Sequence, residues 1–170
     1  ITVMGNWTHT SMGTGSLITT GSTVVFAMGY TAPNITVSGG HTLNNVQIAQ
    51  YANPSYATSV TLSGTLTVNG DLTYLTYGGT VNDVTTDGGT FDIKGNFTGA
   101  DIMTGGTTAI TFSGTGAQTY NRGAAQDELA GDITVNKASG TLTLASAAAW
   151  DAANQDVTVS QGTFDTGGFN

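Results

Sequence analysis

The chain of 170 residues contains no cysteine, which excludes disulfide bonds and thiolate metal sites. Its three cations are Lys94, Arg122 and Lys137, set against 11 Asp and Glu residues and a formal net charge of −8. Nucleic-acid binding needs clustered cations that release condensed counterions, and three scattered ones cannot supply it. Nucleic acid and anionic membrane surfaces are therefore not expected as partners.

Other residue classes are also scarce. No run approaches the roughly 18 apolar residues of a membrane span, so membrane insertion is not expected. Charged residues make up 8% of the chain, against about 25% in ordinary globular domains. Only 2 residues are Pro, whereas 25 are Gly and 38% are hydrophobic. This composition indicates an ordered chain with many turns and a surface of Thr, Ser, Asn and Gln.

Period-two alternation dominates what is present. The segment "TLTVNGDLTYL" (65–75) places Leu66 and Val68 on one side and Thr65 and Thr67 on the other, followed by an Asn-Gly turn. Such patterns predict short strands separated by tight turns. Similar segments recur about every ten residues. The Ala-rich segments 124–131 and 145–155 are expected to be loops rather than helices.

Strands this short cannot bury a face alone, so successive turns of chain must stack. We expect an all-β, parallel β-solenoid with roughly 20 residues per coil and about eight coils. An antiparallel β-sandwich is the alternative, because evenly spaced strands also describe that fold.

Two phrases recur within the chain. "GNWT" at 5–8 returns as "GNFT" at 95–98, and each is followed by a Gly- and Thr-rich link and a strand that ends in Phe. We interpret the chain as a single all-β unit made of two diverged repeats, about 1–90 and 91–170.

The two ends of the chain are similar to one internal phrase. "QGTFDTGGFN" (161–170) followed by "ITVMGNWT" (1–8) matches "GGTFDIKGNFT" (88–98), apart from one residue of length. The ends are therefore expected to complete one another, through a longer covalent repeat or through a neighbouring subunit, although chance similarity of Gly- and Thr-rich strands remains an alternative. The residues expected at this contact are Ile1, Val3, Trp7, Phe164 and Phe169.

The segments "SGTLTVNGDLT", "FSGTGAQTY" and "GDITVNKASGTLTL" resemble repeats of very large secreted bacterial surface proteins, of the adhesin and autotransporter-passenger type. The resemblance implies a secreted or cell-surface protein with a structural or adhesive role and no catalytic residues to carry over. We therefore expect a non-enzymatic subunit or repeat of an extracellular filament or stalk. Its partner would be itself, as a head-to-tail homopolymer or a tandem repeat, with no cofactor.

Alternative functions rest on particular side chains. A carbohydrate-binding or adhesive module would use Trp7, Trp150, Tyr51 and Tyr56 as stacking faces. Ice binding would use hydroxyls of Thr-x-Thr pairs at 65–67 and 141–143, although such pairs also simply stabilise a sheet. An enzyme acting on polysaccharide needs convergent carboxylates that the spacing does not show.

Two kinds of modification or metal site are conceivable. Asp83, Asp87 and Asp92 in "NDVTTDGGTFD" offer oxygen ligands for calcium, with turn capping as the ordinary reading. The Gly-Gly-x-Gly-x-Asp pattern of calcium-binding β-rolls is missing. The Asn-x-Thr triplets that begin at Asn6, Asn34 and Asn96 are possible glycosylation sites.

Overall fold

The computed structural model describes residues 1–8, 20–29, 34–51, 57–77 and 83–169, and its regular structure in these ranges consists of strands and no helix. The strands are β1 (Thr2–Val3), β2 (Thr23–Met28), β3 (Asn34–Ser38), β4 (His41–Leu43), β5 (Asn45–Tyr51), β6 (Thr58–Ser63), β7 (Thr65–Val68), β8 (Leu72–Tyr77), β9 (Val84–Asp87), β10 (Thr90–Ile93), β11 (Phe97–Thr98), β12 (Ala109–Phe112), β13 (Gln118–Asn121), β14 (Ile133–Leu144) and β15 (Val157–Asp165).

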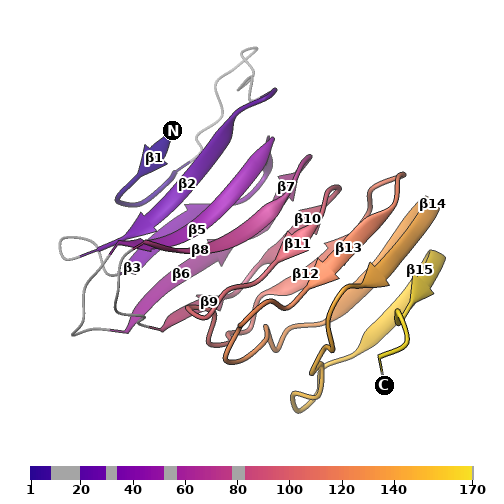
Figure 1. The fold of residues 1–170 in the computed structure, drawn as a ribbon. Coiled ribbons are helices and arrows are strands. Elements are labelled where there is room, and N and C mark those ends of the chain that lie inside the picture. Colours follow the sequence, from indigo (N-terminus) through magenta and orange to yellow (C-terminus); the bar gives the residue numbers. More distant parts are fainter. Residues whose placement is uncertain (9–19, 30–33, 52–56, 78–82, 170) are drawn as a thin grey trace.

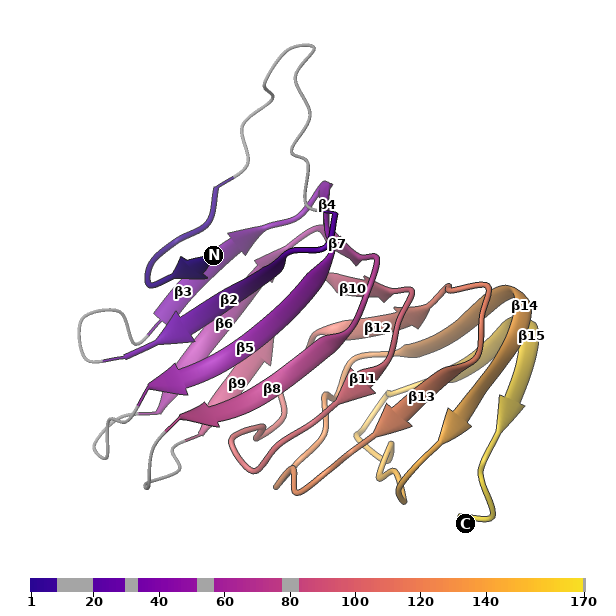
Figure 2. The same cartoon turned by 45° about the horizontal axis from the view of Figure 1, so that its top comes forward.

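The strands form three faces, and the chain visits them in a fixed order (Figures 1 and 2). Face 1 contains β1, β2, β5, β8, β11, β13 and the second halves of β14 and β15. Face 3 contains β3, β6 and β9, and face 2 contains β4, β7, β10, β12 and the first halves of β14 and β15. The long strands β14 and β15 thus run across the corner between faces 2 and 1.

Neighbouring strands are parallel in all of the described pairs, which confirms the parallel β-solenoid and rules out the antiparallel sandwich. The coils are less even than the sequence suggests. Val84 pairs with Met103, 19 residues further on, whereas Val46 pairs with Leu72, 26 residues further on. The solenoid consequently makes about 6 turns, fewer than the eight expected from a uniform coil.

The interior is built from columns of apolar side chains, because parallel in-register pairing places equivalent positions of successive coils above one another. One buried column of face 1 consists of Val24, Val46, Leu72, Phe97, Tyr120 and Leu144. A column of face 2 consists of Leu43, Val68, Ile93, Phe112 and Val135. Each such side chain contributes about 1.5–3 kcal/mol by leaving water, so stacking of coils supplies the stability that one coil lacks.

Aromatic rings continue from coil to coil toward the C-terminal end. Tyr74 and Phe97 have ring centroids 6.0 Å apart, and Phe97 lies flat on Tyr120 at 4.9 Å with planes 4° apart. Trp150 meets Tyr120 edge-on at 4.9 Å and stacks on Phe164 at 5.8 Å. Both contacts are favourable ring arrangements that add to the burial of apolar area.

Polar side chains stabilise the corner that leads into face 1. The Asn45 Oδ1 atom accepts from the Asp71 N–H at 3.0 Å, and the Asp71 Oδ1 atom accepts from the Asn96 N–H at 2.7 Å. The Asn96 Oδ1 atom in turn accepts from the Thr119 N–H at 2.9 Å. This ladder explains why Asn and Asp recur beside Gly in the sequence, since their short side chains cap turn backbone.

The Ala-rich segments 124–131 and 145–155 contain no helix and run as loops between faces, as predicted. No helix long and apolar enough to span a membrane occurs in the described ranges.

Candidate functional site

The C-terminal end of the solenoid leaves two interior columns uncovered. Val157 and Val159 pair with Ile133 and Val135, so they occupy the same inward positions one coil further along. Ile133 and Val135 are 1% and 0% exposed, whereas Val157 and Val159 are 44% and 48% exposed. Apolar area that every earlier coil buries is therefore in contact with solvent at this end.

The backbone of β15 is an edge as well. One side pairs with β14, and no described residue pairs with the other side, so a row of N–H and C=O groups faces outward. Edge strands are usually protected by Lys, Pro or a covering segment. The strand "VTVSQGTFD" carries neither Lys nor Pro. Such an edge is a template for adding another parallel strand.

Aromatic residues flank this open end. Phe164 lies opposite Leu142 in β14, is partly buried, and stacks on Trp150 at 5.8 Å. Phe169 is 37% exposed, and its N–H donates to the Thr166 carbonyl oxygen at 3.0 Å. Of the two, Phe164 thus belongs to the interior stack, and Phe169 lies at the surface.

At the opposite end, β1 covers part of face 1. Val3 lies opposite Phe26 and packs against the core, and the Ile1 amino group donates to the Thr23 carbonyl oxygen at 2.9 Å. Ile1 and Met4 remain exposed, at 68% and 59%. This end also presents apolar area, but on side chains outside the main columns.

Trp7 covers face 3 at the same end. Its N–H donates to the Thr36 carbonyl oxygen and its carbonyl oxygen accepts from the Ser38 N–H, both at 2.8 Å. The Trp7 Nε1–H donates to the His41 Nε2 atom at 2.8 Å, and its ring packs edge-on against Phe26 at 6.0 Å. Nε2 of His41 must carry no proton to accept this bond. Trp7 therefore closes the edge of β3 with both backbone and side chain.

The five residues expected at an assembly contact separate into two groups. Ile1 and Val3 lie in or next to β1 and Trp7 pairs with β3, whereas Phe164 lies in β15 and Phe169 follows it. β1 and β15 lie at opposite ends of the solenoid (Figure 1). One chain therefore cannot bring the two groups together, and a contact between them requires a second chain or copy.

The repeated phrases do not occupy equivalent positions in the coil. Trp7 bridges to Val37 on face 3, whereas Phe97 pairs with Leu72 on face 1. Likewise Phe91 lies on face 2 and Phe164 on face 1. The likeness of the two ends to 88–98 thus reflects similar strand composition at different places of the coil. The division into two repeats near residue 90 stays a prediction.

The three calcium candidates are not gathered into one site. The Asp87 Oδ1 atom accepts from the Thr107 N–H and hydroxyl at 3.1 and 3.2 Å, and the Asp92 Oδ1 atom accepts from the Ser113 hydroxyl at 2.5 Å. The Asp83 carbonyl oxygen accepts from the Thr58 N–H at 2.9 Å. In the described ranges, no group of three or more His, Cys, Asp or Glu side chains could hold a metal ion.

The three Asn-x-Thr asparagines differ in exposure. Asn6 and Asn34 are exposed and Asn96 is half-buried. Each side-chain oxygen already accepts a hydrogen bond: from the Thr36 N–H at Asn6, from the Ser59 hydroxyl at Asn34 and from Thr119 at Asn96. Glycosylation of any of them stays a prediction.

The alternative binding faces are only partly described. Trp7 and Trp150 are half-buried and pack against core rings, while the Tyr51 side chain and Tyr56 lie outside the described residues. The Thr pair at 65–67 lies on face 2 and the pair at 141–143 on face 1, so they do not form one hydroxyl array. No pocket occurs in the described part of the chain.

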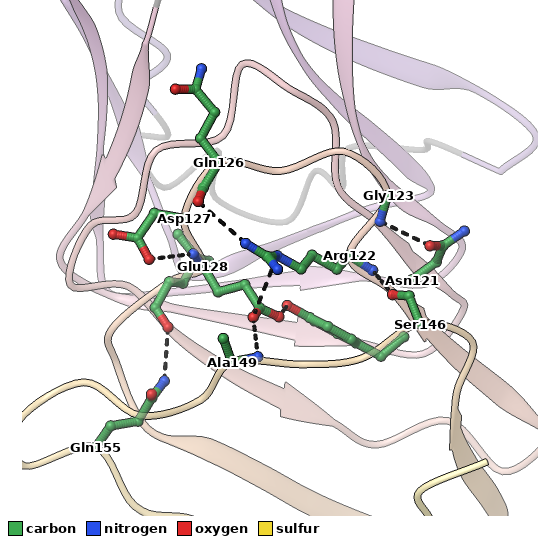
Figure 3. Close-up of polar contacts among 11 residues, drawn as sticks. Asn121, Arg122, Gly123, Gln126, Asp127, Glu128, Ser146, Ala149 and Gln155 are labelled. Atoms are coloured by element: carbon green, nitrogen blue, oxygen red, sulfur yellow. Dashed lines mark hydrogen bonds and ion pairs between the residues drawn. The ribbon is translucent and has the colours of Figure 1, made fainter. Parts of the chain in front are cut away.

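Sequence reasoning missed a buried polar cluster near the C-terminal end (Figure 3). Glu128 is 4% exposed and accepts from the Tyr120 hydroxyl and the Ala149 N–H, with the Arg122 Nε atom 3.7 Å from its carboxylate. Burial, and then the charge of Glu128, raise the pKa of Tyr120 well above its ordinary value. The cluster attaches the loop 145–155, which precedes β15, to the interior.

These features define a parallel β-solenoid of about 6 turns. Trp7 covers the edge of β3 near the N-terminal end, and in the described part of the chain β1 and β15 each have one paired side. Comparison with known proteins finds no matching family model, no matching curated protein and no matching solved structure.

Proposed function

We propose that this protein is a non-enzymatic structural segment of an extracellular filament or stalk, and that it lengthens by adding a second copy to β15. The observation that carries the proposal is the exposure of Val157 and Val159, which occupy inward-facing positions of β15, a strand that has a described partner on one side. Internal coils bury the equivalent side chains, Ile133 and Val135, against the next coil. A further coil stacked on β15 would bury Val157 and Val159 in the same way.

The N-terminal end of a second copy is the occupant to which the proposal commits. β1 and the second half of β15 both lie on face 1, so parallel pairing of β1 with Thr163–Asp165 of another copy continues that face. Val157 and Val159 lie next to this pairing, on face 2 of the same coil, and stacking of the second copy on the whole coil is what would cover them. Ile1 and Met4 add apolar side chains at the contact. A head-to-tail contact between different ends forms a ring only where the rotation closes; stacking along the solenoid axis carries the ends apart, so the proposed contact generates a filament.

The extracellular setting is supported by composition and resemblance. The three Lys and Arg residues leave few sites for trypsin-like proteases, which is useful outside a cell. The surface-protein repeats that the sequence resembles are exported structures of this general kind.

The test is sedimentation velocity of the chain over a concentration series. The wild type is expected to form species larger than a monomer as concentration rises, because the end contact is small and must overcome the entropy of association. The double variant Val157→Lys and Val159→Lys places two charges on the open columns and is expected to remain monomeric.

Thr158→Lys provides the matched control. Thr158 alternates with the two valines on the outer side of the same strand, so this variant adds charge to β15 without touching the inward columns. It is expected to assemble like the wild type. A wild type that stays monomeric at the highest concentration, or a double variant that assembles equally well, contradicts the proposal.

A further inference from the structure

A buried lysine and a buried glutamine meet where the chain turns from face 2 to face 1. Lys137 and Gln118 are 0% and 1% exposed. The Lys137 Nζ atom donates to the Gly114 carbonyl oxygen at 2.6 Å and to the Gln118 Oε1 atom. The ion pair of the described residues is between Arg122 and Glu128, so no described carboxylate neutralises this amine. Burying a charge without a counter-charge costs folding free energy, so a lysine at this position needs a physical explanation.

Both polar atoms of the Gln118 side-chain amide form hydrogen bonds. The Gly114 N–H donates to the Gln118 Oε1 atom at 3.0 Å, on the same oxygen that Lys137 approaches. The Nε2 atom donates to the carbonyl oxygens of Ile93 at 3.0 Å and Gly95 at 2.5 Å. The amide is therefore fixed in place, with its carbonyl oxygen polarised by a backbone donor.

Two glycines allow the close packing around this pair. A Cβ atom at Gly114 would lie 3.0 Å from the Gln118 Cδ atom, and one at Gly162 would lie 2.7 Å from the Lys137 Cβ atom. A larger residue at either position would therefore displace the Gln118 amide or the root of the Lys137 side chain. The contact is enclosed by backbone, which keeps competing water away from it.

The surroundings also favour the reactive form of the amine. Burial lowers the pKa of Lys137 below its ordinary value, because an ammonium group loses hydration in the interior. The neutral amine has a lone pair and is the nucleophilic form of lysine.

We propose that Lys137 and Gln118 join in an intramolecular isopeptide bond. The Lys137 Nζ atom attacks the Gln118 Cδ atom and forms a C–N bond, while the bond from Cδ to Nε2 breaks. The attacking nitrogen gives one proton to Nε2, which leaves as ammonia, so the step needs neither an oxidant nor a reductant. The Gly114 N–H stabilises the negative charge that develops on Oε1, and the Gly114 carbonyl oxygen positions the amine.

The product links two positions 19 residues apart. The chain between them runs from face 1 through face 3 and along face 2, so the bond closes most of one coil into a covalent ring. Such a cross-link restricts the unfolded chain as a disulfide does. It would supply a covalent brace to a protein that has no cysteine.

Intact mass spectrometry of the purified full chain tests the proposal. The wild type is expected to be lighter than its sequence mass by one molecule of ammonia, and fragmentation is expected to give a branched peptide that joins residues 118 and 137. Lys137→Met keeps an unbranched side chain without a nucleophile and is expected to have the full sequence mass.

Lys94→Met is the matched control, because Lys94 is exposed and its variant should retain the loss of ammonia. A wild type with the full sequence mass overturns the proposal. So does a loss of ammonia that maps elsewhere, such as a cyclic imide at Asn69-Gly70. If Lys137→Met does not fold, the wild-type peptide map still decides the question.

Discussion

The two ends of this solenoid differ in how far their edge strands and apolar side chains are covered. At the N-terminal end, Trp7 pairs with β3, donates to His41 and packs against Phe26, so the edge of face 3 is covered. At the C-terminal end, Val157 and Val159 stand in the interior columns and remain about half exposed, at 44% and 48%. This difference is the basis of the proposal that β15 receives another coil.

Coils in the interior of the solenoid also differ from those at both ends in the number of neighbouring coils. Coils in the middle are covered on both sides, and their column side chains are at most a few per cent exposed. The end coils have one neighbour each, so the same type of side chain gains less there from folding. Substitutions at equivalent positions should therefore show a gradient from the middle outward.

The largest effect is expected for Phe97→Ala. Phe97 is 0% exposed between Tyr74 and Tyr120, so its removal leaves a cavity in the aromatic stack that costs about 3–5 kcal/mol. Phe164→Ala, next to the open end, should cost only about 1 kcal/mol, because less area returns to water. Urea unfolding monitored by circular dichroism measures both, and equal losses would contradict the gradient.

The second-largest effect is expected from alkaline pH, which should lower the free energy of unfolding. Burial raises the pKa values of Tyr74 and Tyr120 far above the ordinary value of 10.0. These tyrosines ionise in the unfolded chain first, so their contribution is complete below pH 10.0 and decreases as pH rises above it. Each of the two tyrosines then lowers the free energy of unfolding by about 1.4 kcal/mol per pH unit.

Urea midpoints between pH 9 and about 11.5 would measure this slope. Tyr74→Phe should reduce it by about half at the start of the alkaline limb, since one of the two buried groups is gone. A stability that stays level across this range would show that these hydroxyls are not buried.

Trp7→Phe should have the smallest of these effects. The variant keeps an aromatic ring over Phe26 but loses the hydrogen bond from Trp7 Nε1 to His41, which is worth about 1 kcal/mol. The same experiment on Trp7→Ala, which also loses the ring contact, should give a larger loss. If Trp7→Phe is as damaging as Trp7→Ala, the hydrogen bond rather than the ring closes this end.

The fold class was predictable because alternation and turn residues act locally. Segments such as 65–68 alternate apolar and polar residues, and Asn or Asp beside Gly marks corners that lead into face 1, as at 69–71 and 95–96. The number of coils was not predictable, because loop lengths between faces vary and pairing partners lie 19 to 30 residues apart. Nor could the phrases at 5–8 and 95–98 be assigned to different faces, since similar short strands suit any face.

The lack of Lys and Pro along β15 can be read directly from the sequence. The burial of the two charged residues cannot be read in this way. Glu128 lies in an Ala-rich loop that gives no signal of burial. The alternation of β14 does place Lys137 on the inward side with Ile133 and Val135, but a lysine is expected at the surface. The contacts that hold the two charges, with Ala149, 21 residues away, and with Gly114, 23 residues away, are not encoded locally.

Hydrogen–deuterium exchange of β15 as a function of protein concentration tests the central claim most directly. If another copy pairs with this edge, the β15 amides that point away from β14 should exchange more slowly as concentration rises, while β12 amides, already paired on both sides, stay unchanged. Exchange in β15 that is independent of concentration would contradict the claim that this end receives a second copy.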